Sequence, residues 1–169
     1  MERSSGILLP LFSLPSPYGI GTMGLAAYDF ADLLSALDEI PGDYLIRFMS
    51  SQPKDASFKL FDTMARCKHV AKQLHLPVQS GCDRVLRAMN RPYDVARYLD
   101  LITYARRVMP ELVLTSDVII GFPGETEAEA METVDLVRQV EFDALFTFIF
   151  SPRPGTCLLY TSPSHETGA

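Results

Sequence analysis

The sequence is poor in cysteine. Its 169 residues include three, Cys67, Cys82 and Cys157, which lie far from one another along the chain. Zinc sites and iron–sulfur clusters take thiolate ligands from closely spaced cysteines, and this spacing matches neither. An odd number of cysteines in a chain without a secretion signal also argues against a disulfide framework. We therefore expect reduced, structural thiols and no metal site built from these residues.

Long apolar runs are also missing. The longest stretches, such as residues 144–150, have the length of a β-strand and are far too short to span a membrane. No basic segment followed by an apolar one opens the chain, so we expect a cytoplasmic protein without a membrane partner. With 47% hydrophobic and 21% charged residues, the composition is typical of one globular domain.

The chain has no excess of basic residues either. Its formal net charge is −6, whereas affinity for nucleic acids comes mainly from Lys and Arg side chains that neutralise phosphates. The composition thus argues against a free-standing nucleic-acid-binding protein. A local basic face stays open, because Arg84, Arg87 and Arg91 share one face of an expected helix. They would contact RNA phosphates there or simply lie in solvent.

What the sequence does contain is an alternation of strands and helices. Four apolar segments have strand length: residues 44–49, 73–78, 113–122 and 144–150. Apolar residues at helical spacing follow Asp94 in residues 95–109. A capping box of Thr126 and Glu129 opens another helix. The stripe expected to be buried in that helix consists of Met131, Val134, Val137 and Val140. This order predicts an α/β fold with a parallel sheet, either open or part of a barrel.

Parallel sheets bind ligands beyond the carboxyl ends of their strands, so the loops after these segments form the candidate site. Gln79 and Ser80 offer uncharged donors and acceptors for hydroxyl groups or a carboxylate. The Phe-Pro-Gly-Glu sequence ending at Glu125 predicts a type II turn, and Gly121 before it leaves room for a ligand. Each loop has a structural alternative; Ser80 could simply be a helix N-cap. For His75, a hydrogen-bonded core histidine is favoured over a catalytic base.

Five motifs in the sequence resemble those of one enzyme family. They are RFMSSQPKD (47–55), HLPVQSG (75–81), NR (90–91), SDVIIGFPGET (116–126) and SPRPGT (151–156). In this order and at these distances they are similar to the motifs of the radical S-adenosylmethionine (radical SAM) methylthiotransferases. Within that family they resemble most the enzymes that methylthiolate isopentenylated adenosine in tRNA. The resemblance covers residues 33–156 and implies an incomplete α/β fold, the carboxyl-terminal half of a partial (βα)6 TIM-like barrel.

The resemblance also implies a set of binding residues. S-adenosylmethionine would lie along the turn after residues 73–78 and along the end of the strand at residues 113–122. The candidates for cofactor binding are Gln79, Ser80, Asp117, Ile119, Gly121 and Glu125. Loops on the substrate side contribute Ser51 and Arg153. No catalytic residue and no metal ligand is implied.

The cofactors of this family are S-adenosylmethionine and 4Fe-4S clusters, and its substrate is tRNA. Family members bind one cluster through a Cys-x3-Cys-x2-Cys loop and a second through cysteines of an N-terminal domain. Neither set, nor the family's RNA-binding domain, occurs in this sequence. Reductive cleavage of S-adenosylmethionine needs an electron from an iron that binds it. We therefore expect a fragment that is inactive alone and has no stable partner of its own.

The two ends of the chain do not share this resemblance. Residues 4–34 are similar to the opening of 4-α-glucanotransferases of the amylomaltase type, and residues 157–169 match no family. Residues 19–24 spell G-x-G-x-x-G, but two prolines separate them from the preceding apolar run, which favours a sugar-site loop or plain turn over a dinucleotide site. We expect a composite chain divided into residues 1–34, 35–156 and an unstructured 157–169. A glucanotransferase fragment and a non-catalytic remnant are the alternative functions.

Overall fold

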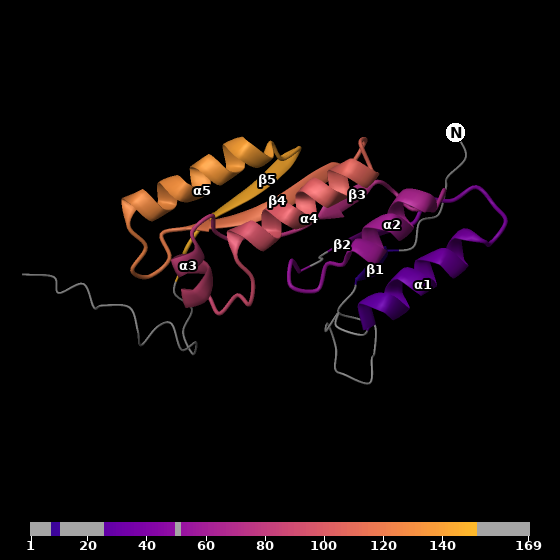
Figure 1. Ribbon diagram of the computed structural model, residues 1–169, viewed down its shortest axis with the longest axis horizontal. Coiled ribbons are helices and arrows are strands. Elements are labelled where there is room, and N and C mark those ends of the chain that lie inside the picture. The colour runs from indigo at the N-terminus through magenta and orange to yellow at the C-terminus, as the bar shows by residue number, and fades with distance from the viewer. Residues whose placement is uncertain (1–7, 11–25, 50–51, 152–169) are drawn as a thin grey trace, which may run out of the picture.

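The computed structural model describes residues 8–10, 26–49 and 52–151, in which strands and helices alternate along the chain (Figure 1). The strands are β1 (Leu8–Pro10), β2 (Arg47–Met49), β3 (Gln73–His75), β4 (Val113–Ile120) and β5 (Ala144–Ile149). The helices are α1 (Ala26–Asp38), α2 (Phe58–Arg66), α3 (Asp83–Ala88), α4 (Val95–Val108) and α5 (Glu127–Val140). All four strands expected from the sequence are present, each somewhat shorter than expected. Among the helices of these residues, none has the length and apolar character needed to cross a membrane.

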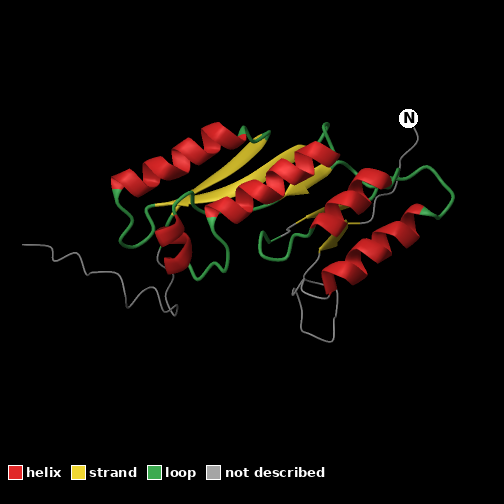
Figure 2. Cartoon of the chain, in the orientation of Figure 1, coloured by secondary structure: helices red, strands yellow, loops and turns green. Residues whose placement is uncertain are grey.

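All pairings between these strands are parallel. β3, β4 and β5 form one sheet in that order, and β1 pairs with β2 in another. Two backbone hydrogen bonds connect the sheets: Ile46 N donates to His69 O over 2.7 Å, and Ala71 N donates to Ile46 O over 2.9 Å. Helices α2, α4 and α5 run along one side of the strands (Figure 2). The predicted α/β class and parallel, barrel-like sheet are confirmed.

The core lies between the strands and these helices. Along β4, Leu114, Ser116 and Val118 are buried, while the residues between them are only half-buried. This alternation is typical of a strand that is covered on one side. Helix α4 covers that side with Tyr98 and Leu101, both fully buried. Burial of one large apolar side chain contributes roughly 1.5–3 kcal/mol, so this layer provides much of the stability.

The other side of the three-stranded sheet, which we call the open face, carries polar and aromatic side chains. The open face is formed by His75, Thr115, Asp117, Ile119, Phe146 and Phe148. Phe146 and Phe148 of β5 are 53% and 54% exposed, and Ile149 on the opposite side of that strand is 86% exposed. Within the described residues, β5 is therefore an edge strand that is accessible on both sides.

Helix α1 belongs to the same core as the sheet. Phe30 and Leu34 are buried, and the ring of Phe30 packs edge-on against that of Phe48 with centroids 5.1 Å apart. Helix α1 continues without a break past residue 34, where we expect the first segment of a composite chain to end. That division of the chain stays a prediction. The G-x-G-x-x-G motif at residues 19–24 and the tail at 157–169 lie outside the described residues.

The predicted helix caps are present, but the buried face of α5 differs from the prediction. Asp94 caps α4, since its Oδ1 accepts from Arg97 N over 2.8 Å. Thr126 and Glu129 form the predicted capping box of α5. The predicted stripe of α5 is wrong at its first position, because Met131 is 45% exposed. The residues of α5 that are buried are Thr133, Leu136 and Val140.

The turn after β3 explains why the stripe is rotated. A Cβ atom on Gly81 would lie 2.6 Å from Thr133 Cα and 2.7 Å from Glu132 O. Gly81 N also donates to Thr133 Oγ1 over 2.8 Å. Such close contact between two backbones requires glycine. It turns Thr133, and not Met131, toward the sheet.

The pairing of β3 with β4 is interrupted after Leu76: Leu76 N donates to Thr115 O, but Val78 N, the next donor toward β4 in a regular ladder, bonds to a side chain instead. The register changes across this interruption. His75 pairs with Thr115 before it, and Gln79 pairs with Val118 after it, so the first strand contains one residue more than its partner between these pairs. This extra residue makes the segment a β-bulge, a feature often found beside active sites.

Two side chains satisfy the backbone of the bulge. Ser116 Oγ accepts from Val78 N over 3.0 Å and donates to Leu76 O over 2.9 Å. Tyr98 donates its hydroxyl to the same Leu76 O over 2.7 Å. All of these residues are fully buried. Because a buried group without a partner costs about 1–3 kcal/mol, these bonds make the interruption of the strand tolerable.

Replacement of Ser116 should therefore destabilise the fold more than replacement of Tyr98. Ser116→Ala leaves the buried Val78 N–H without an acceptor and should lower the free energy of unfolding by about 2 kcal/mol. Tyr98→Phe leaves Leu76 O with its bond from Ser116 and should cost about 1 kcal/mol. Urea denaturation measures both, and equal losses would contradict the role assigned to Ser116.

The contact of Gly81 with α5 gives a second test. Gly81→Ala should lower the free energy of unfolding by about 3 kcal/mol, because helix backbone cannot move aside. Gly124→Ala is the matched control: its φ is +76°, but nothing lies within 4 Å of a Cβ there. Strain alone should then cost about 1–2 kcal/mol. A loss at Gly81 no larger than that at Gly124 would show that the turn does not depend on close contact.

Candidate functional site

The bulge leads directly into the first turn of the candidate site. Gln79 has a positive φ of 72°, which is uncommon for a residue with a Cβ. Its backbone is fixed on β4 by two hydrogen bonds: its N donates to Asp117 O, and its O accepts from Ile119 N, each over 2.9 Å. Its half-buried side-chain amide has no hydrogen-bond partner among the described residues. A strained residue with a free amide is typical of a binding site.

Ser80, the next candidate, belongs to the support of the turn. It is fully buried, its Oγ accepts from Cys82 N over 3.2 Å, and it lies 3.3 Å from Thr133 Oγ1. The N-cap of α3 is Cys82, so the alternative interpretation of Ser80 as an N-cap is wrong. The hydroxyl instead fastens the turn to α5, and any part that Ser80 has in ligand binding stays a prediction.

The second turn, after β4, is held by its own glutamate. Glu125 Oε2 accepts from Gly121 N over 2.5 Å and from Phe122 N over 3.2 Å. Glu125 N donates to Phe122 O over 2.8 Å and Gly124 has a φ of +76°, which confirms the predicted type II turn. The other carboxylate oxygen, Oε1, is buried and has no partner among the described residues. Gly121 has a φ of +77° with open space beside it, so a ligand has room there.

An ion pair joins the two turns. Arg84 of α3 binds the carboxylate of Glu129 with Nε and Nη2, the latter over 2.7 Å, and donates to Gly124 O over 2.6 Å. Glu129 also accepts from the backbone N and the hydroxyl of Thr126. Hydrogen bonds from Arg84 and Thr126 hold the pKa of Glu129 far below its usual range, and the bond with Glu129 raises the pKa of Arg84. The sequence analysis missed this pair, because its members lie on different helices that are distant in the chain.

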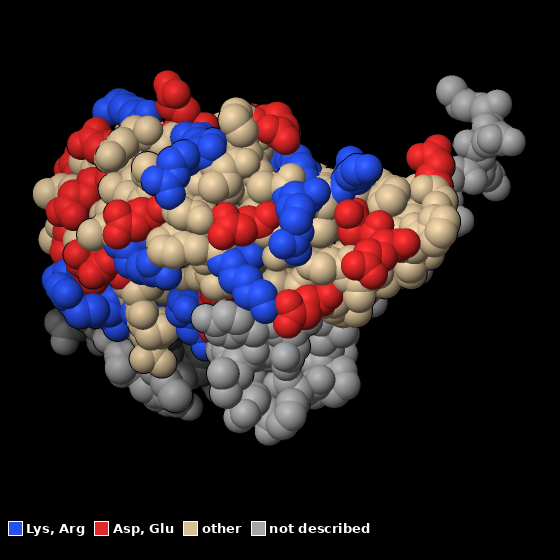
Figure 3. All heavy atoms as spheres, turned by 45° about the vertical axis from the view of Figure 1, so that its right-hand side comes forward, with Lys and Arg blue, Asp and Glu red and all other residues tan. Residues whose placement is uncertain are grey.

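The ion pair also changes the interpretation of the arginines on α3. Arg84 is engaged with Glu129, so the three arginines do not form a uniform face that is free for phosphates. On the face shown in Figure 3, Lys and Arg side chains alternate with Asp and Glu side chains. Lys59 Nζ, for example, lies 2.6 Å from Asp32 Oδ1. For the other two arginines, contact with RNA phosphates and exposure to solvent both stay predictions.

A row of polar side chains crosses the open face between β3 and β4. His75 Nδ1 lies 2.9 Å from Thr115 Oγ1, and His75 Nε2 lies 3.5 Å from Asp117 Oδ1. The ring of Phe146 meets that of His75 edge-on at 6.1 Å. His75 is thus a hydrogen-bonded histidine, as expected. Ile119, the next residue on this face, pairs with Phe148 in the parallel register.

The structure brings together most of the predicted site residues, but not all. Gln79, Asp117 and Ile119 are linked through backbone hydrogen bonds, and Gly121 follows at the end of the same strand. Ser51 and Arg153, the predicted substrate-side residues, lie outside the described residues.

The described cysteines do not fit an iron–sulfur cluster. Cys67 ends α2 before β3, whereas Cys82 precedes α3 after β3, so the two cysteines belong to opposite ends of that strand. Both are buried, and burial raises the pKa of each thiol, which disfavours the thiolate that iron requires. No group of three or more metal-ligating side chains occurs in the described part of the chain. Cys157 lies outside it.

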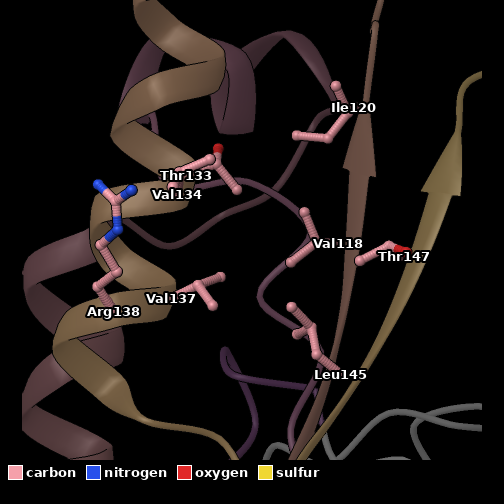
Figure 4. Close-up of a pocket in the computed structure, with 8 residues that line it drawn as sticks. All are labelled: Val118, Ile120, Thr133, Val134, Val137, Arg138, Leu145 and Thr147. Carbon is pink, nitrogen blue, oxygen red and sulfur yellow. The ribbon is translucent and has the colours of Figure 1, made fainter.

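A separate pocket of about 200 Å³ opens on the helix side of the sheet (Figure 4). It is lined by Val118, Ile120, Thr133, Val134, Val137, Arg138, Leu145 and Thr147. Its one charged side chain, Arg138, pairs with Asp135 over 3.0 Å. The pocket is apolar and faces away from His75 and Asp117, so it is not part of the candidate site.

Comparison with known proteins identifies relatives of this chain. The sequence is 48% identical over 130 residues to the tRNA-2-methylthio-N(6)-dimethylallyladenosine synthase of Desulfitobacterium hafniense. The matched residues make up 77% of this chain and 29% of that protein. It is 46% identical over 127 residues to the enzyme of the same name from Clostridium botulinum, and the matched residues make up 75% of this chain and 28% of that protein. The chain therefore spans less than a third of the length of these relatives.

Solved structures share the fold at lower identity. Coproporphyrinogen III oxidase from Escherichia coli has a TM-score of 0.60 at 22% identity, over 75% of this chain and 29% of that one. The radical S-adenosylmethionine methyltransferase TsrM from Kitasatospora setae has a TM-score of 0.61 at 15% identity, over 76% and 26%. The sequence pattern of the radical SAM superfamily matches residues 20–137, and the chain belongs to that superfamily.

Proposed function

We propose that this chain supplies the S-adenosylmethionine-binding strands of a methylthiotransferase that acts on isopentenylated adenosine in tRNA. The observation that carries the proposal is the 48% identity over 130 residues to an enzyme whose name describes that product. Members of the superfamily use S-adenosylmethionine together with 4Fe-4S clusters, as in the methyltransferase TsrM. In this proposal tRNA is the substrate of the complete enzyme, and the cytoplasm is where it acts.

The residues at the strand ends suit S-adenosylmethionine in their chemistry. The molecule offers ribose hydroxyls, an adenine ring and a positively charged sulfonium. Asp117, whose side chain is 26% exposed, provides a carboxylate for hydroxyls or for the positive charge. The side-chain amide of Gln79 provides donors and an acceptor, and the open space at Gly121 allows the ligand to approach the backbone. When bound, S-adenosylmethionine supplies the reactive adenosyl group of radical SAM chemistry.

We further propose that the chain does not carry out the reaction alone. Electron transfer to S-adenosylmethionine requires a cluster held by thiolates. Cys67 and Cys82 are buried on opposite ends of β3 and do not suit that role. In this proposal the described residues bind and orient the cofactor, and the cluster is held by other parts of a longer enzyme.

A hybrid enzyme tests the proposed function. Residues 35–151 would replace the matching segment of the Desulfitobacterium hafniense relative, and tRNA nucleosides would be analysed by mass spectrometry. We expect methylthiolated nucleoside from the hybrid and at least tenfold less from its Asp117→Asn variant. Asp135→Asn, which affects an exposed ion pair on α5, is the matched control and should leave the yield unchanged. A hybrid that folds and holds iron but leaves tRNA unmodified would overturn the proposal.

Reconstitution of the isolated chain tests the proposed lack of a cluster. After anaerobic incubation with iron and sulfide and removal of unbound metal, we expect far less than one cluster per chain. The Cys67→Ala and Cys82→Ala variants should retain as little iron as the native chain, because neither thiol is a ligand. Near-stoichiometric iron and sulfide, lost on substitution of either cysteine, would contradict this prediction.

A further inference from the structure

We propose that His75 positions the carboxylate of Asp117 for the ligand, and that its Nε2–H is the group that does so. The proposal rests on the proposed function, since it assigns a role to a residue deeper in the same site. His75 lies one strand away from Asp117 and pairs in register with Thr115, which precedes Asp117 on the same face of β4. Its ring therefore reaches along β4 from Thr115 to Asp117.

The two ring nitrogens have partners of different character. Thr115 Oγ1 can donate or accept, and it lies 2.9 Å from Nδ1. Asp117 Oδ1 can only accept as a carboxylate, and it lies 3.5 Å from Nε2. If the proton of the neutral ring were on Nδ1, the lone pair of Nε2 would face a carboxylate oxygen. Electrostatics therefore favours the tautomer in which Thr115 donates to Nδ1 and Nε2–H points toward Asp117.

The ring of His75 is largely enclosed by its surroundings. His75 is 9% exposed, and Phe146 of β5 packs edge-on against it. Among the described residues, Asp117 is the one carboxylate that forms an ion-pair contact with a ring nitrogen of His75. The side chain of Asp117 is 26% exposed, so the carboxylate remains accessible on the open face while one of its oxygens faces the imidazole.

The same segment of the chain also holds the backbone of Asp117. Asp117 O accepts from Gln79 N over 2.9 Å, just beyond the bulge that follows His75. The segment from His75 to Gln79 thus holds both the side chain and the main chain of Asp117. A carboxylate with a fixed direction loses less conformational freedom when it accepts from a ribose hydroxyl or approaches a sulfonium than a freely rotating one does.

Two conservative variants separate positioning from mere packing. The amide of glutamine reaches the place of Nε2, so His75→Gln keeps a donor for Asp117 and gives up the contact with Thr115. The amide of asparagine reaches the place of Nδ1, so His75→Asn keeps the contact with Thr115 and leaves Asp117 without a donor. Urea denaturation of both variants shows that each is folded under the conditions of the binding experiment.

The binding experiment is a titration of the full chain with S-adenosylmethionine, followed by the chemical shifts of its amides. We expect His75→Gln to bind within threefold of the native chain and His75→Asn to bind at least tenfold more weakly. In an Asp117→Asn background, His75→Asn should cause no further loss, because its effect passes through that carboxylate. Equal losses in the two histidine variants, or additive losses with Asp117→Asn, would overturn the proposal.

A measurement without ligand distinguishes failure of this inference from failure of the proposed function. Nitrogen-15 spectra of the histidine ring should show the proton of neutral His75 on Nε2, and this preference should disappear in Asp117→Asn. A proton on Nδ1 in the native chain would overturn the inference whatever the binding result. A native chain with the expected tautomer that binds no S-adenosylmethionine would instead overturn the proposed function and the ligand part of this inference, and leave the coupling of His75 to Asp117 intact.

Discussion

A β-bulge after the third strand determines the geometry of the region where ligands would bind. The segment between His75 and Gln79 contains one residue more than its partner on β4, so Val78 N does not bond to the backbone of that strand. The chain then pairs again through Gln79, which takes a positive φ to do so. This bulge is tolerated because Ser116 and Tyr98 replace the hydrogen bonds that the strand loses. The direction in which the following turn leaves the sheet is a consequence of this one interruption.

The two turns at the strand ends behave as one unit because each is tied to α5. The first turn packs on Thr133 through Gly81, and the second begins the helix through the capping box of Thr126 and Glu129. Arg84 closes the connection, since it binds both Glu129 and Gly124 O. A shift of α5 would therefore move both turns together and preserve the spacing between Gln79 and Gly121.

The sequence predicted those features that depend on neighbouring residues. The capping box, the cap at Asp94 and the type II turn before Glu125 each involve residues close together in the chain, and all three were correct. The buried stripe of α5 was wrong because it depends on Gly81, which belongs to a distant part of the chain. The row from Thr115 through His75 to Asp117 depends on the register of two strands, which periodicity does not reveal. The resemblance to a family predicted the site residues but not the contacts that support them.

The orphaned oxygen of Glu125 is the feature of the second turn that its internal contacts do not explain. Oε2 accepts from two backbone amides and would stabilise the turn without help from Oε1. Oε1 is buried without a partner among the described residues, and a buried acceptor in that state costs about 1–3 kcal/mol. A glutamine would hold the turn less well, because its one oxygen is a weaker acceptor than a carboxylate. The carboxylate of Glu125 therefore serves the amides of Gly121 and Phe122.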